Sequence, residues 1–127
     1  MTQDEKKLLL RDLCARLPYG VKGRVSRSDS NNRKCEFVAT IDGKLYDRFA
    51  VAQESWFDNV IIKPYLYPLS SMTEEQKNEY QYITERWMND SSYSIGDSID
   101  WLNKNHFDYK GLIEIRLAID ATGLNIY

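Results

Sequence analysis

The N-terminal part of the chain has hydrophobic residues at the spacing of an α-helix, followed by a strand-like alternation. Leu9, Leu13 and Leu17 fall on one stripe, and charged residues occupy most of the other positions. Pro18 disfavours helical backbone at the residue before it, so we expect the helix to end near Leu17. Residues 19–26 ("YGVKGRVS") then alternate apolar and polar side chains with a period of two, which predicts a strand with one solvated face.

Two further apolar segments, 34–40 and 44–51, flank turn residues and predict a β-hairpin. A type I turn with a G1 bulge at Gly43 pairs Thr40 with Lys44, and this register collects the apolar side chains on one face. The residues of that face are Cys35, Phe37, Ala39, Leu45, Phe49 and Val51. We therefore expect a hairpin whose inner face is buried. The strands 19–26 and 34–40, joined by the loop "SDSNN", make the first hairpin, which precedes it.

The stretch 61–80 ("IIKPYLYPLSSMTEEQKNEY") marks a change from sheet to helix. A fourth strand begins near Val60, but Pro64 cannot donate to a sheet ladder, so this strand is an edge strand or ends at Lys63. Thr73 and Gln76 have the spacing of a capping box, which predicts a helix that begins there.

The C-terminal part contains another helical pattern and one ambiguous segment. Ser94 is a suitable N-cap, and Ile99 and Leu102 recur at helical spacing after it. His106, the only histidine of the chain, falls where this helix should end. In residues 112–120 Ile and Leu alternate as in a strand, yet nothing in the segment excludes a helix, so both interpretations stay open.

Together these patterns predict an α+β fold with an N-terminal helix, a small twisted antiparallel sheet of about four strands, and two or three C-terminal helices. Closure of the sheet into an SH3-like barrel is one version of this fold. The length of 127 residues suits a single domain, β-rich over 19–66 and helical over 73–106.

The net charge of −2 hides an uneven distribution along the chain. Residues 1–50 carry eleven Lys or Arg against seven Asp or Glu, whereas residues 51–127 carry six against twelve. The positive excess gathers around the first predicted hairpin and could contact phosphates, although basic side chains at a sheet edge also discourage unwanted strand pairing. The residues of this cluster are Lys22, Arg24, Arg27, Arg33 and Lys34.

The search for chemistry finds no phosphate-binding loop, no zinc motif and no nucleophile elbow, so we expect no cofactor, no metal and no catalytic activity. If there were an active site, Asp108 could orient His106 as a base, with Tyr109 beside them. Cys14 and Cys35 lack metal-like neighbours and are expected to be buried free thiols.

No segment has the length and apolarity of a membrane span, and the N-terminus lacks the pattern of a signal peptide. These two observations predict a cytoplasmic protein with no membrane partner.

Three blocks of the sequence resemble a family of short uncharacterised proteins from gut Bacteroides, often encoded in phage-like or mobile-element regions. The blocks are "LLLRDLCARLPYGVKG", "IKPYLYPLSSMTEEQ" and "DWLNKNHFDYKGLIEIRLAID". The family has Arg and Met where this chain has Tyr67 and Leu69, Arg and Gly at Lys110 and Arg116, and Lys at Ile115. The resemblance implies an accessory protein of a phage or mobile element, and carries over no catalytic residues.

Two binding functions are compatible with these patterns. The favoured hypothesis is a non-catalytic module that binds a protein partner through Tyr65, Tyr67 and Tyr109, because tyrosines bury a large area and keep a polar tip. The alternative is nucleic-acid binding through the basic hairpin 22–34. Neither the partner nor the oligomeric state follows from the sequence.

Overall fold

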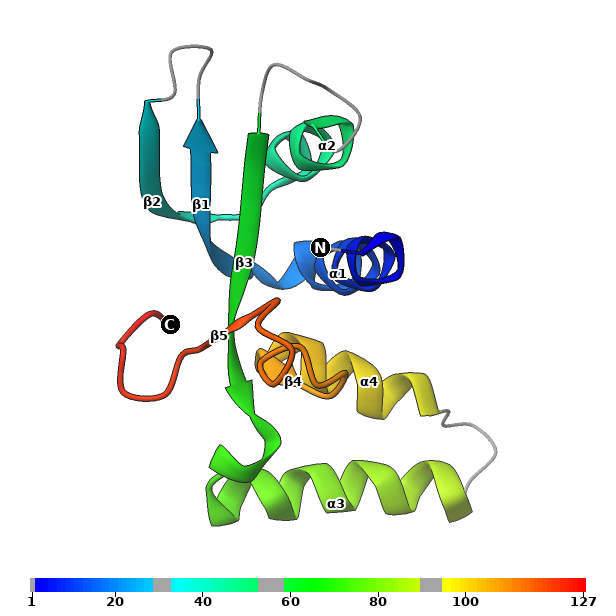
Figure 1. The fold of residues 1–127 in the computed structure, drawn as a ribbon. Helices are drawn as coiled ribbons and strands as arrows, with labels where there is room; N and C mark the ends of the chain where they lie inside the picture. The colour runs from blue at the N-terminus through cyan, green and yellow to red at the C-terminus, as the bar shows by residue number, and fades with distance from the viewer. Residues whose placement is uncertain (1, 29–32, 53–58, 90–94) are drawn as a thin grey trace.

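A computed structural model describes residues 2–28, 33–52, 59–89 and 95–127, and it confirms the α+β class (Figure 1). The helices are α1 (Gln3–Arg16), α2 (Gly43–Ala52), α3 (Glu74–Asn89) and α4 (Ile95–Lys104), and the strands are β1 (Lys22–Ser28), β2 (Lys34–Thr40), β3 (Asn59–Pro68), β4 (Phe107–Asp108) and β5 (Ile119–Asp120). Short 3₁₀ turns, Leu17–Tyr19 and Leu69–Ser71, follow α1 and β3. The predicted end of the first helix near Leu17 is confirmed.

The strands form one open, mixed sheet in the order β2-β1-β3-β4, with β5 also paired to β3. β1 pairs antiparallel with both β2 and β3, whereas β4 and β5 run parallel to β3. The expected SH3-like barrel is wrong, and the sheet is not purely antiparallel. The C-terminal part supplies only two-residue strands, which pair beside β3 and do not reach β2.

The segment predicted as the second strand of a hairpin, 44–51, forms helix α2 instead. Asp42 caps this helix, because its Oδ1 accepts a hydrogen bond from the Leu45 N–H at 2.8 Å. Leu45 and Phe49 lie four residues apart, so one helical face carries both toward the core, where Phe49 is fully buried. The G1 bulge at Gly43 therefore does not form.

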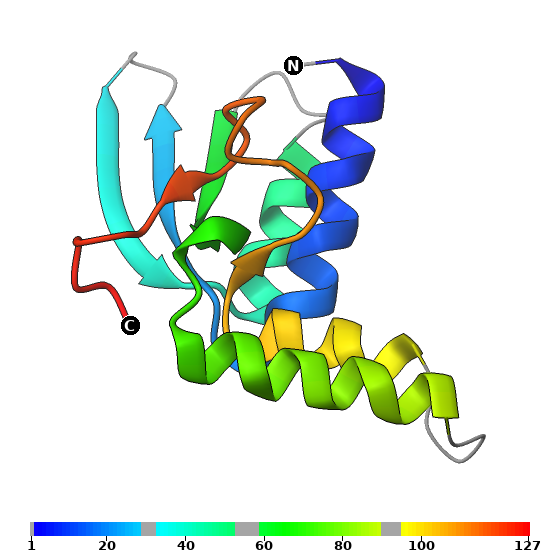
Figure 2. The ribbon, with the colours of Figure 1, turned by 90° about the horizontal axis from the view of Figure 1, so that it is seen from below.

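The predicted buried face of β2 is also wrong, because the second strand that would have covered it is absent. Cys35 and Phe37 are exposed, and Ala39 alone of that face packs at the margin of the core. In Figures 1 and 2 β2 lies at the outer edge of the sheet, away from all four helices. Cys14 is exposed as well, so both cysteines are free thiols but neither is buried as expected.

Pro64 does not end β3 or make it an edge strand. The antiparallel ladder with β1 stops at the pair Gly23–Pro64, and the strand then continues because β5 and β4 pair with its remaining residues. Gly23 is required at this point: a Cβ there would lie 3.1 Å from both the Ile62 side chain and the Lys63 carbonyl oxygen. β3 is thus the central strand of the molecule.

Two hydrophobic clusters hold the layers together. In the first, Leu9 and Leu13 of α1 and Phe49 of α2 pack against β1 and β3, as the stripe on the N-terminal helix predicts. In the second, Trp101, Leu102 and Phe107 pack with side chains from the start of α3 and the end of β3, namely Tyr67, Met72, Tyr80 and Ile83. The second cluster joins the α3–α4 pair to the sheet (Figure 2).

Helix α3 begins as predicted. The Gln76 N–H donates to the Thr73 Oγ1 at 3.1 Å, and the Thr73 N–H donates to the Gln76 Oε1 at 2.9 Å, which completes the capping box. The predicted N-cap of α4, Ser94, lies outside the described residues. Four exposed glutamates give α3 an acidic surface: Glu74, Glu75, Glu79 and Glu85.

Residues 112–120 are neither a continuous strand nor a helix. The Asp108 carboxylate accepts the N–H groups of Leu112 and Ile113, both at 2.9 Å, and so organises an irregular turn. The N–H groups of Leu117 and Ala118 then donate to the Leu112 carbonyl oxygen. Only the last two residues of the segment join the sheet, as β5.

Candidate nucleic-acid interface

A groove of about 590 Å³ opens over β1, β2 and β3 and is lined mainly by basic side chains. We call it the cationic groove. Its basic residues are Lys6, Arg24, Arg27, Lys34 and Lys63; its other lining residues are Ser26, Ser28, Glu36, Val60 and Ile61. Five positive charges therefore surround a single carboxylate.

Strand register explains how most of these residues reach one surface. Along β1, Arg24, Ser26 and Ser28 alternate onto the same face, because successive side chains of a strand point to opposite sides. Ser26 pairs with Glu36 in β2 and with Ile61 in β3. Ser28 pairs with Lys34, and Arg24 pairs with Lys63, so the three strands contribute to one face.

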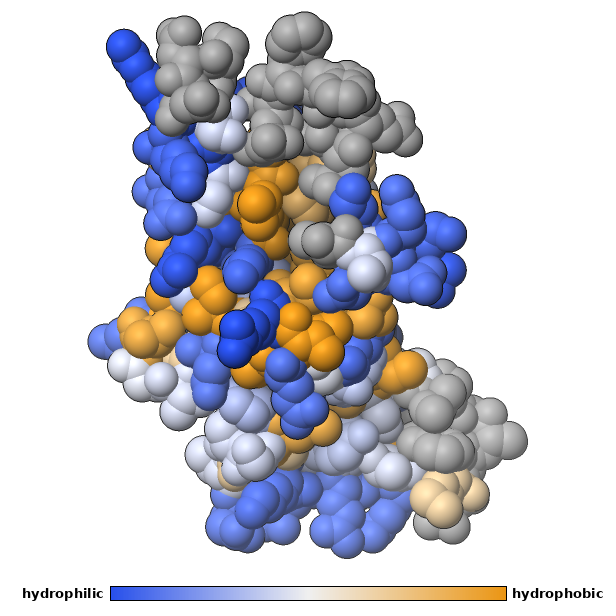
Figure 3. Space-filling model, in the orientation of Figure 1, coloured by the Kyte–Doolittle hydropathy of each residue, from blue (hydrophilic) through white to orange (hydrophobic). Residues whose placement is uncertain are grey.

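The floor of the cationic groove is apolar and its walls are polar. Ile61 is 44% exposed, whereas Val60 is buried. Figure 3 shows a hydrophobic patch over β3, flanked by hydrophilic surface over β1 and β2 on one side and over the start of α1 on the other. Such a floor could contact the non-ionic parts of a ligand while the walls attract its charges.

Like charges repel one another in the cationic groove when no ligand is bound. Arg24 and Lys63 are direct cross-strand neighbours, and like charges in this position destabilise a sheet. The one carboxylate, Glu36, accepts a hydrogen bond from the Ser26 hydroxyl at 3.3 Å. An anionic ligand would remove the repulsion that the fold otherwise tolerates.

The sequence identified only part of this site. Arg24, Arg27 and Lys34 line the cationic groove as the nucleic-acid hypothesis requires, whereas Arg33 is exposed but lies outside its lining. Lys22 faces the C-terminal segment, where its Nζ donates to the Ile126 carbonyl oxygen at 3.0 Å. Lys6 and Lys63 were missed, because their place depends on how α1 and β3 dock onto β1.

The three tyrosines of the protein-partner hypothesis do not form an open surface. Tyr65 is only 3% exposed and therefore has almost no surface for a partner. Tyr67 is half-buried and packs between Phe107 and another aromatic ring, with centroid distances near 6 Å. Tyr109 is half-buried beneath the Arg16 guanidinium, at 5.4 Å, and burial raises the pKa of its hydroxyl.

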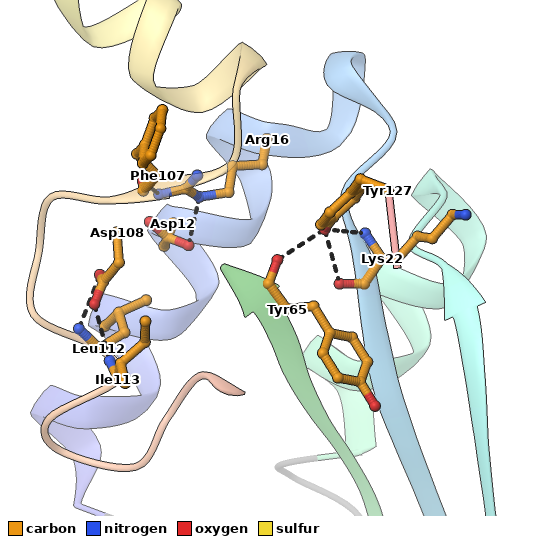
Figure 4. A network of polar contacts seen from close by, with 9 residues as sticks. All are labelled: Asp12, Arg16, Lys22, Tyr65, Phe107, Asp108, Leu112, Ile113 and Tyr127. Atoms are coloured by element: carbon orange, nitrogen blue, oxygen red, sulfur yellow. Dashed lines mark hydrogen bonds and ion pairs between the residues drawn. The ribbon is translucent and has the colours of Figure 1, made fainter. Parts of the chain in front are cut away.

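The residues that could have formed an active site are engaged in structural contacts, and Figure 4 shows those of Asp108. Both oxygens of Asp108 accept backbone N–H groups, so this carboxylate does not orient His106. The His106 ring stacks on Tyr127 at 3.7 Å, and its Nδ1 has no hydrogen-bond partner. Burial, with the nearby charges of Arg16 and Lys22, lowers the pKa of His106 to about 4.

Tyr127 is the structural residue that the sequence patterns gave no reason to select. Its hydroxyl accepts the Lys22 N–H at 2.8 Å and lies 2.8 Å from the Tyr65 carbonyl oxygen, to which it donates (Figure 4). Burial raises the pKa of Tyr127 to about 12, so the hydroxyl keeps its proton. The C-terminal segment is thereby fixed beside β1 and β3, at the Lys22 end of the sheet.

Comparison of the chain with protein-family models, with curated proteins and with solved structures gives no match. No described helix has both the length and the apolar character that crossing a bilayer requires. Within the part of the chain that the structure describes, no three His, Cys, Asp or Glu side chains gather as metal ligands.

Proposed function

We propose that the protein binds nucleic acid through the cationic groove. The observation that carries this proposal is the direct pairing of Arg24 with Lys63 in a groove that three further basic residues also line. A fold gains nothing from placing two cations on neighbouring strands, whereas a phosphate backbone needs several cations at close spacing. Binding to a polyanion would offset the repulsion between these two side chains.

The shape of the cationic groove supports the same proposal. Its apolar floor at Ile61 suits the faces of sugars and bases, and its basic walls suit the phosphates on either side. Phosphate contacts of this kind give affinity without sequence specificity. We therefore propose that the protein binds the phosphate backbone of the nucleic acid without sequence specificity.

The proposal replaces protein binding through the tyrosines as the better-supported function, because Tyr65 is buried and the other two are half-buried. The further proposal that the chain is an accessory protein of a phage or mobile element rests on the sequence resemblance alone. A cytoplasmic location remains part of this proposal.

Binding of fluorescent single-stranded and duplex oligonucleotides across a salt series tests the function. The double variant Arg24→Ala/Lys63→Ala should bind about tenfold more weakly or worse, and the slope of log K against log salt should fall by about 1.5. Its thermal stability should be unchanged or higher, because the variant removes a like-charge pair.

The matched control is Lys44→Ala/Lys77→Ala, which removes two exposed charges on α2 and α3, outside the cationic groove. This control should retain wild-type affinity. The proposal fails if the wild-type protein does not retain either oligonucleotide at low salt, or if the control loses as much affinity as the groove variant.

A further inference from the structure

The outer edge of β2 is a second surface that the proposed function does not use. β2 ends the path of the sheet and pairs only with β1 among the described strands. Its other side therefore presents a row of backbone N–H and C=O groups, which is a template for another strand. The segment is seven residues long, above the length of a typical strand.

Both faces of β2 are exposed, which is unusual for a strand with large apolar side chains. Phe37 is 41% exposed on one face and Val38 is 51% exposed on the other. The helices pack over β1 and β3 but do not extend over β2, as both ribbon views show (Figures 1 and 2). Pairing with a strand would cover these side chains.

β2 carries few of the features that protect an edge from pairing. It contains no proline, and its charges, Lys34 and Glu36, stand at its N-terminal end. The remaining residues, Phe37 to Thr40, are uncharged. Natural edges that must stay unpaired usually carry charges, prolines or bulges.

We propose that β2 pairs antiparallel with β2 of a second copy of this chain, with Phe37 on the two-fold axis. In this register Phe37 faces Phe37, Glu36 faces Val38 and Lys34 faces Thr40, so no like charges meet and all seven residues are paired. The strand is thus complementary to itself, which is why we choose a second copy as the occupant.

Neighbouring registers are worse. Centring the pair on Glu36 would oppose two carboxylates directly. Centring it on Val38 would require Ile41 to pair, yet Ile41 has left the strand and is buried in the core. The dimer has a single favourable register, and its two-fold axis is perpendicular to the sheet, so both cationic grooves lie on the same face of the joined sheet.

A concentration series by sedimentation velocity tests the dimer with a matched pair of variants. In Phe37→Lys the two introduced ammonium groups face each other, so the dissociation constant should rise about tenfold or more. In Val38→Lys the introduced ammonium faces Glu36 of the second copy, so the dimer should persist. Melting curves should show that both variants fold.

Cross-linking tests the register independently. In a Cys14→Ser/Cys35→Ser background, oxidation should link Phe37→Cys copies through the two-fold axis. Val38→Cys in the same background should not link, because its thiols are offset along the strands. A wild-type protein that remains monomeric at all concentrations, equal effects of the two lysine variants, or equal cross-linking of the two cysteine variants would each overturn the proposal.

Discussion

His106 illustrates how the setting of one residue decides its chemistry. Its backbone adopts a positive φ of 62° at the end of α4, and its ring stacks on Tyr127. The sequence placed this histidine at the end of a helix, where its charge would suit the helix dipole. The fold half-buries the ring near the charges of Arg16 and Lys22, so the neutral form is favoured.

The lowered pKa of His106 predicts a loss of stability in acid. The unfolded chain takes up a proton near pH 6.5, whereas the folded protein resists it until about pH 4. Between these values the unfolded state binds more protons, so the free energy of unfolding decreases as the pH falls through this window.

Urea unfolding at several pH values measures this effect. His106→Asn is a suitable comparison, because asparagine tolerates a positive φ and does not titrate. Relative to this variant, the wild-type protein should lose stability between pH 6.5 and 4. If the free energy of unfolding had the same pH dependence in both proteins, the lowered pKa of His106 would be contradicted.

Residue types alone predicted some of the candidate site and none of its geometry. Arg24, Arg27 and Lys34 were recognisable as a basic cluster in the sequence. Lys63 was not, because its position beside Arg24 depends on the register between two strands that lie far apart in the chain. The prediction that the tyrosines form a binding surface failed for a related reason. Whether a tyrosine ring is exposed depends on which other elements pack over it.

Among the elements, the start of α3 was predicted correctly, whereas the choice between helix and strand at residues 44–51 was not. The Thr73–Gln76 capping box is a local signal and needs no tertiary contact to be read. In contrast, Leu45 and Phe49 fit both a period of two and a helical spacing of four, and Asp42-Gly43 suits a turn as well as a cap. Only the packing of α2 against the core decides between them.

The capping box at the start of α3 should have a measurable effect on stability. Thr73→Ala removes the side chain that accepts the Gln76 N–H, so the free energy of unfolding should fall by about 1 kcal/mol. Chemical denaturation measures this loss. Thr122→Ala, at another exposed threonine, should change stability by much less, and an equal loss in both variants would contradict the role of the cap.

At the scale of the whole molecule, one buried ion pair connects the two hydrophobic clusters. The Arg16 Nε donates to the Asp12 Oδ2 at 2.9 Å, and its Nη2 donates to the Phe107 carbonyl oxygen at 2.6 Å (Figure 4). Both side chains are fully buried. Asp12 and Arg16 belong to α1, whereas Phe107 belongs to the cluster beneath α3 and α4.

Breaking this pair should destabilise the fold more than replacing it. Arg16→Met leaves the Asp12 carboxylate buried without its partner and should cost about 3–5 kcal/mol of unfolding free energy. The double variant Asp12→Leu/Arg16→Met removes both charges and should recover much of that loss. Urea denaturation of the two variants measures the difference, and equal losses would show that the charge of Asp12 is not the cause.

The overall class was predictable because it follows from local patterns, whereas the topology was not. Each two-residue strand, β4 and β5, is too short to leave a periodic signal, yet together they make β3 the centre of the sheet. The SH3-like barrel was one version of the predicted fold, and it presupposed a small antiparallel sheet of about four strands. Residues 44–51 form α2 and therefore do not supply one of the predicted strands.

The separation of charge in the fold has a consequence for how the protein meets a polyanion. Basic residues surround the cationic groove, and exposed glutamates cover α3 on another part of the molecule. If the protein binds a phosphate polymer as proposed, the field of the polymer would exert a torque on this distribution, turning the groove toward the polymer and α3 away from it before contact. Collisions would then be oriented, and diffusion would bring the proposed binding surface to the polymer first.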